Sequence, residues 1–145
     1  MRFYEYLNSN QWTLYHGSNS EQIVGTLYAN ERDSGWFGSG FYLTAYPEYA
    51  KRWGQFIHNM IPPQGKYAEI NCYNNYQKIE YVGDAEKANE LAGGKAGWVT
   101  DEHAWSQQFT NNLKSMGYSG VRINLDNHKD VEVLVFDPSK IKVVS

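Results

Sequence analysis

The sequence of 145 residues contains a single cysteine, Cys72, so it excludes an internal disulfide and a metal site built from several cysteines. It contains no apolar run long enough to span a bilayer, and residues 1–6 lack the apolar stretch of a secretory signal. It also lacks a basic excess, because 13 Lys and Arg stand against 16 Asp and Glu. We therefore expect a soluble, cytoplasmic protein with no membrane partner and no stable nucleic-acid binding.

The composition is that of a folded protein, with 41% hydrophobic, 16% aromatic and 20% charged residues. The length is typical of one domain, and no linker or repeat divides it, so we expect a single domain over residues 1–145. Strand patterns occur at residues 11–16, 41–44, 67–73, 78–82, 121–124, 131–136 and 141–144, and helix patterns begin near Ser18, Pro47 and Thr100. This order predicts an α+β fold with mostly antiparallel strands.

The first segment whose residues could bind a ligand is Tyr15-His16-Gly17-Ser18, at the end of the first expected strand. A glycine lets a ligand approach the backbone closely, and the Ser18 hydroxyl would add a hydrogen bond. The alternative is a capping box, in which Ser18 and Glu21 begin a helix and His16 has no special role.

The second segment runs from Gly38 through Tyr42 to the expected helix that carries Trp53. It is glycine-rich, but it is not a phosphate-binding Walker sequence. The flat rings of Tyr42 and Trp53 could hold a flat ligand between them. The alternative is that Trp53 packs in the core, because it shares a helical stripe with Ala50, Ile57 and Met60.

The third segment is the strand at residues 131–136, in which Glu132 shares a face with Leu134 and Phe136. A carboxylate on such an apolar face must be paired, hydrogen-bonded or placed at a binding site, unless the strand lies at an edge that lets it reach solvent. Other ionisable residues are less informative: His58, His103 and His128 have no metal-ligand spacing, so we expect no metal site.

Taken in order, these segments resemble the ADP-ribosyltransferase family. The sequences are Tyr-His-Gly-Ser, then Gly-Ser-Gly-Phe-Tyr-Leu-Thr, then Glu-Val-Leu-Val-Phe-Asp-Pro-Ser-Lys-Ile-Lys near the end. The resemblance is to the His-Tyr-Glu branch, which includes diphtheria toxin and the poly(ADP-ribose) polymerases, and to small bacterial and phage members. It implies a split β-sandwich of two mostly antiparallel sheets with flanking helices. Residues 61–114 carry no motif of the family.

The resemblance also implies a role for each motif residue, with NAD as co-substrate. His16 would hydrogen-bond the adenosine-side ribose, Gly17 would hold the nicotinamide carboxamide through its backbone, and Ser18 would assist. Tyr42 and Trp53 would stack on the two faces of the nicotinamide, although the polymerase branch usually has a tyrosine at the second position. Glu132 would be the catalytic glutamate, bonded to the 2′-hydroxyl of the nicotinamide ribose.

The resemblance implies mono-ADP-ribosylation of a macromolecular acceptor, which we expect to be a protein. The enzyme would be a toxin, an effector or a phage-encoded modifier, and an inhibitor or antitoxin would be a further partner. Such an enzyme would act in the cytoplasm of its producer or of a target cell. Asp130 lies two residues before Glu132, where the arginine-modifying branch has its second acid. An NAD glycohydrolase, a transferase acting on nucleic acid, a catalytically silent NAD-binding module and a purely structural domain remain as alternatives.

Overall fold

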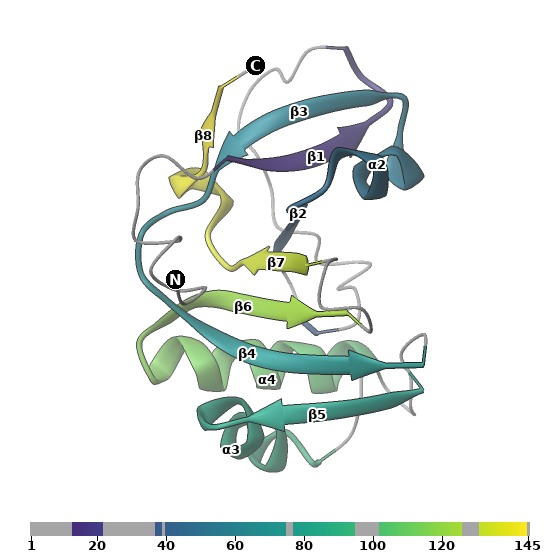
Figure 1. Ribbon diagram of the computed structural model, residues 1–145. Helices are drawn as coiled ribbons and strands as arrows, with labels where there is room; N and C mark the ends of the chain where they lie inside the picture. Colours follow the sequence, from purple (N-terminus) through teal and green to yellow (C-terminus); the bar gives the residue numbers. More distant parts are fainter. Residues whose placement is uncertain are drawn as a thin grey trace.

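The computed structural model describes residues 13–21, 37–38, 40–74, 77–94, 102–125 and 131–144 (Figure 1). The helix expected near Ser18, with Ile23, Val24 and Leu27, lies outside these residues, as does Asp130. In chain order the elements are β1 (Leu14–Ser18), β2 (Phe41–Thr44), α2 (Pro47–Ala50), the 3₁₀ turn η1 (Lys51–Trp53), β3 (Phe56–Ile61), β4 (Lys66–Tyr73), β5 (Lys78–Val82), α3 (Asp84–Leu91), α4 (Glu102–Ser115), β6 (Tyr118–Asn124), β7 (Val131–Val135), the 3₁₀ turn η2 (Pro138–Lys140) and β8 (Lys142–Val143).

The described strands form one eight-stranded sheet in the order β5-β4-β6-β7-β2-β1-β3-β8. Only the β4–β6 pair is parallel among them, so the prediction of an α+β fold with mostly antiparallel strands is confirmed. The prediction of two separate sheets is wrong, because Tyr15 of β1 pairs with Thr44 of β2 and joins the two halves. This is the one residue pair recorded between β1 and β2 in the described chain, whereas β1 pairs with β3 over five residues.

The two faces of the sheet bury different clusters. Helices α3 and α4 lie together against the half of the sheet formed by β4, β5 and β6 (Figure 1). On that face Leu134 and Phe136 pack with Phe109 and Leu113 of α4. On the opposite face Val133 and Val135 belong to a second cluster with Leu14, Leu43, Met60, Tyr67 and Ile141. Strand β7 is therefore covered on both sides, and its side chains alternate as the sequence predicts.

The helix pattern that begins near Thr100 is confirmed by α4. Its stripe of Trp105, Phe109 and Leu113 is buried in the first cluster, with Met116 partly buried against it. The helix ends before Gly117, which has φ of +89°, a conformation that suits glycine. Helix α3 was not expected from the sequence, because its buried residues are the small Ala85 and Ala88, which give only a weak apolar stripe.

The predicted helix from Pro47 to Met60 is wrong beyond its first turns. Helix α2 has four residues, η1 adds three, and Gly54 then leads into strand β3. The physical reason is that Gly54 favours a break, and that residues from Phe56 onward are buried alternately, as in a strand, with His58 and Met60 inside. Trp53 therefore does not share a helical stripe with Ile57 and Met60.

Candidate functional site

Glu132 is a buried carboxylate on the helix-covered face of β7. It lies directly opposite Thr44 of β2 on one side and Ile123 of β6 on the other. Its exposed fraction is 6%, and it shares its face with Leu134, which packs against α4. The alternative of an edge-strand glutamate facing solvent is wrong, because β7 lies between β6 and β2. A carboxylate at this depth must be hydrogen-bonded or paired to be stable, and Glu132 does take part in such an interaction.

Tyr42 lies on the same face as Glu132, one step along the β2–β7 ladder. It is paired with Leu134, while Thr44 is paired with Glu132. The Tyr42 hydroxyl donates a hydrogen bond to the Gly38 carbonyl (3.0 Å) and accepts one from the Phe37 amide (3.2 Å). The backbone of Phe37 and Gly38, just before β2, thus holds the phenol ring of Tyr42 in place.

His16 links β1 to β2 through its side chain, next to the point where the recorded β1–β2 ladder stops. Its Nδ1 lies 3.1 Å from the Tyr42 carbonyl oxygen, and its ring lies 4.3 Å from the ring of Phe41. Because a carbonyl oxygen only accepts, Nδ1 carries the proton, and in the neutral ring Nε2 is an acceptor. Burial lowers the pKa of His16, the Tyr42 hydrogen bond opposes this change, and His58 lowers the pKa further.

Gly17 and Gly54 dock the α2–η1 turn onto β1. A Cβ at Gly17 would overlap the carbonyl oxygen of Ala50, and a Cβ at Gly54 would overlap the backbone of Ser18. Any other residue at these two positions would push the turn away from the strand. Gly17 is therefore required for close packing of backbone against backbone, whether or not a ligand also binds there.

Ser18 is engaged within its own turn, because its Oγ accepts a hydrogen bond from the Ser20 amide at 3.0 Å. Because successive residues of a strand point to opposite faces, the side chains of His16 and Ser18 leave β1 on the same face, and Gly17 between them faces the other way. Strand register places Tyr15 opposite Thr44 and so on the face of Glu132, whereas the side chains of His16 and Ser18 leave β1 on the other face.

Trp53, at the end of η1, has an exposed fraction of 53%. The alternative that it packs in the core is therefore wrong. Its ring meets that of Tyr49 edge to face at 5.0 Å, and the Arg52 guanidinium lies 4.5 Å above the Tyr49 ring. Because Ala50 and Gly54 contact Gly17 and Ser18, Trp53 lies in a turn fixed to the strand that carries His16.

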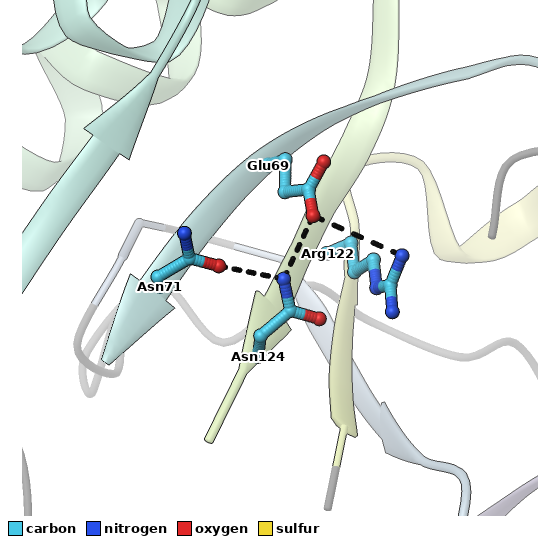
Figure 2. A network of polar contacts seen from close by, with 4 residues as sticks. All are labelled: Glu69, Asn71, Arg122 and Asn124. Carbon is cyan, nitrogen blue, oxygen red and sulfur yellow. Dashed lines mark hydrogen bonds and ion pairs between the residues drawn. The ribbon is translucent and has the colours of Figure 1, made fainter. Parts of the chain in front are cut away.

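A second polar cluster, which the sequence reasoning missed, lies on the opposite face of β4 and β6 (Figure 2). The Asn124 Nδ2 group donates to Glu69 Oε1 and Asn71 Oδ1, both at 2.8 Å, and Arg122 lies 3.9 Å from Glu69. Asn124 has an exposed fraction of 5%. The sequence did contain a signal for this cluster. Glu69 and Asn71 are two residues apart on one predicted strand, as are Arg122 and Asn124 on another, so each pair points to one face of its strand.

The pairing of His16 with His58 across β1 and β3 predicts a pH effect on stability. A lowered pKa means that the unfolded chain binds a proton more readily, so this group favours the folded state above its ordinary value of 6.5 and loses that contribution as pH falls below it. We expect the midpoint temperature of thermal unfolding to be lower at about pH 5.5 than at about pH 7.5. The difference between the two pH values should be smaller in His16→Gln. Differential scanning fluorimetry at matched ionic strength measures both; an equal drop in the variant would contradict the assignment.

The described residues contain no group of three His, Cys, Asp or Glu side chains that could hold a metal ion. Among the same residues, no helix is long and apolar enough to cross a membrane. The structure places Glu132 and Tyr42 on one face of the sheet and His16 on the other face, with Trp53 in the turn that is fixed to β1.

Comparison with known proteins gives little similarity. No protein-family model matches the sequence, and no curated protein matches it. A solved structure, the crystal structure of an anti-CRISPR protein, aligns with a TM-score of 0.47 and 22% sequence identity, over 91% of this chain and 94% of that one.

Proposed function

We propose that this protein is an NAD-dependent ADP-ribosyltransferase, which breaks the N-glycosidic bond to nicotinamide and transfers ADP-ribose to a protein acceptor. The observation that carries the proposal is the buried Glu132 carboxylate, which shares one sheet face with Tyr42 beside the place where the β1–β2 ladder stops. The order of the His, Tyr and Glu motifs in the sequence matches the His-Tyr-Glu branch of this family.

In the proposed complex the nicotinamide lies between Tyr42 and Trp53, and its carboxamide pairs with the backbone of Gly17 with help from Ser18. The half-exposed indole of Trp53 offers an open surface for stacking. The acceptor Nε2 of His16 receives a hydrogen bond from a hydroxyl of the adenosine-side ribose. The lowered pKa of His16 supports this role, because the ring stays neutral near pH 7 and keeps its acceptor.

Glu132 acts on the bond that breaks. The C1′–N bond to nicotinamide breaks and its electron pair leaves with nicotinamide, so positive charge develops on the ribose, as in glycoside hydrolysis. A fixed carboxylate in a buried position stabilises that charge more than it stabilises the bound substrate, and therefore lowers the barrier. The acceptor's lone pair then forms the new bond to C1′, and the proton that the acceptor loses passes to Glu132 or to water.

The proposal includes a biological setting, which is a toxin, effector or phage-encoded modifier acting in the cytoplasm of its producer or of a target cell. The three motifs lie within 145 residues, a length that suits one domain. The acceptor is a protein in this proposal, because the net charge of -3 offers no general attraction for nucleic acid.

The test is to incubate the purified protein with NAD labelled in its adenylate phosphate, with and without a bacterial lysate, and to measure free nicotinamide and labelled macromolecules together. Nicotinamide release with label that is removed by protease supports a protein transferase. Label removed by nuclease would move the acceptor to nucleic acid, and nicotinamide release without label would indicate a glycohydrolase. NAD that binds and is recovered intact would contradict catalysis.

A further inference from the structure

The α2–η1 turn has almost no core of its own, yet several contacts hold it in place. It consists of a four-residue helix and a three-residue 3₁₀ turn, in which Ala50 alone is buried. Ala50 and Gly54, on either side of η1, lie in backbone contact with Gly17 and Ser18 of β1. Figure 1 shows the turn lying against β1 and β3 at the end of the sheet far from α3 and α4. Both ends of η1 are thus fixed to the strand, while Trp53 projects from it.

Trp53 is linked to two neighbours in this turn through ring contacts. The Tyr49 ring lies 5.0 Å from the indole at an angle of 61°, and the Arg52 guanidinium lies 4.5 Å from the centre of the Tyr49 ring. Both geometries are favourable, because an aromatic ring attracts the positive edge of another ring and a cation above its face. The spacing of four between Tyr49 and Trp53, and of three between Tyr49 and Arg52, suits neighbours on one helical surface.

Burial does not explain why this arrangement exists. More than half of the Trp53 side chain is exposed, and Arg52 is exposed too, so the contacts bury little apolar surface. An exposed indole on a turn would normally adopt several rotamers. The Tyr49 ring on one side restricts the indole, and Arg52 restricts Tyr49. The expected effect of these two contacts is to restrict the indole of Trp53 to one orientation.

We propose that Tyr49 and Arg52 are positioning residues, which hold the Trp53 indole in the orientation that stacks on the nicotinamide of NAD. This inference rests on the proposed function for its ligand, but the orientation of Trp53 is a property of the protein alone. Arg52 acts through Tyr49, and Tyr49 acts on Trp53. Neither residue touches the bond that breaks, so both affect binding of the substrate and its transition state equally and change KM rather than kcat.

The experiment compares Arg52→Ala and Tyr49→Ala with two controls, Tyr49→Phe, which keeps the ring, and Lys51→Ala, which removes an exposed cation from the same turn. Initial rates of nicotinamide release give KM and kcat for NAD. We expect Arg52→Ala to raise KM about two- to fivefold, the size of an exposed cation–π contact, with kcat unchanged. Tyr49→Ala is expected to raise KM about tenfold, and the two controls to stay close to wild type.

A second readout needs no NAD. The protein is labelled with 5-fluorotryptophan, and the ¹⁹F signal of Trp53 is assigned by its loss in Trp53→Phe. In Arg52→Ala this signal is expected to shift or broaden, because the indole samples more orientations, whereas in Lys51→Ala it stays unchanged. An unchanged Trp53 signal in Arg52→Ala, or an equal change in Lys51→Ala, would overturn the positioning role.

The two readouts separate this inference from the proposed function. If the wild-type protein neither binds nor cleaves NAD, the proposed function fails, and the fluorine signal still decides whether Arg52 orients Trp53. If NAD is cleaved and the fluorine signal responds, but kcat falls while KM stays constant, the indole does not act in substrate binding and the inference is overturned. A rise in KM with the fluorine response supports it.

Discussion

Replacing Glu132 by glutamine is expected to slow nicotinamide release by about 10²- to 10³-fold, the usual cost of removing one preorganised charge-stabilising group. The substitution keeps the shape of the side chain and removes only its charge, so the buried position between Thr44 and Ile123 stays filled. The neutral amide cannot stabilise a cationic ribose as a carboxylate does. Steady-state rates at saturating NAD measure the effect on kcat directly.

The matched control is Glu86→Gln, the same chemical change on an exposed position of α3. It is expected to leave the rate unchanged, since it lies on a helix that packs against the other half of the sheet. Thermal unfolding of both variants checks that each is folded, because only the rate of a folded protein tests the role of the carboxylate. Undiminished turnover in a folded Glu132→Gln protein would remove Glu132 from the catalytic site.

Most strands could be predicted from the sequence because their signal is local, but β3 could not, since its residues also fit a helical stripe with Ala50 and Trp53. β5 and β2 begin and end where the sequence predicts, and β4, β6, β7 and β8 lie within a few residues of the predicted ranges. Each has alternating or β-branched residues bounded by turn residues, which a window of a few positions detects. The joining of the two halves into one sheet could not be predicted, because it depends on the single pair of Tyr15 with Thr44, which are distant in sequence.

The candidate site also has one part that the sequence predicts and one part that it does not. The placement of Glu132 on a face with Leu134 follows from the period of two along a strand, and the structure confirms it. The surroundings of Trp53 could not be predicted, because the apolar residues on both sides of Gly54 fit a helical stripe by chance. Gly54 is a local signal for a break, but the strand that follows is favoured by tertiary contacts, namely the backbone contact of Gly54 with Ser18 and the burial of His58 and Met60.

The polar cluster of Glu69, Asn71, Arg122 and Asn124 gives the prediction with the largest expected effect on folding (Figure 2). The Asn124 amide donates two hydrogen bonds to the oxygens of Glu69 and Asn71 from a position that is nearly inaccessible to solvent. In Asn124→Asp a carboxylate oxygen replaces the donor and faces two acceptors, one of which is charged. We expect the free energy of unfolding to fall by about 3–5 kcal/mol at neutral pH, as when one partner of a buried polar pair is removed, with Arg122 opposing part of the loss.

The loss should depend on pH with a defined sign. Burial and the Glu69 charge favour the protonated form of the new carboxyl group, so its pKa in the folded protein lies above that in the unfolded chain. The stability lost relative to wild type is therefore smallest at acid pH, where the protonated oxygen can again donate, and grows as pH rises through the folded pKa of the new carboxyl group. Urea unfolding at about pH 4.5 and about pH 7.5 measures this, relative to wild type at each pH.

The control for this substitution is Asn111→Asp on the exposed side of α4, which should change the free energy of unfolding by less than about 0.5 kcal/mol. The cluster also bears on the candidate site, because Asn124 follows Ile123, the residue paired with Glu132. Stabilising the end of β6 therefore stabilises the part of β7 that carries Glu132, the proposed catalytic residue. If Asn124→Asp were as stable as wild type at neutral pH, or if its loss did not change with pH, the Asn124 amide would not be the donor that holds β4 and β6 together.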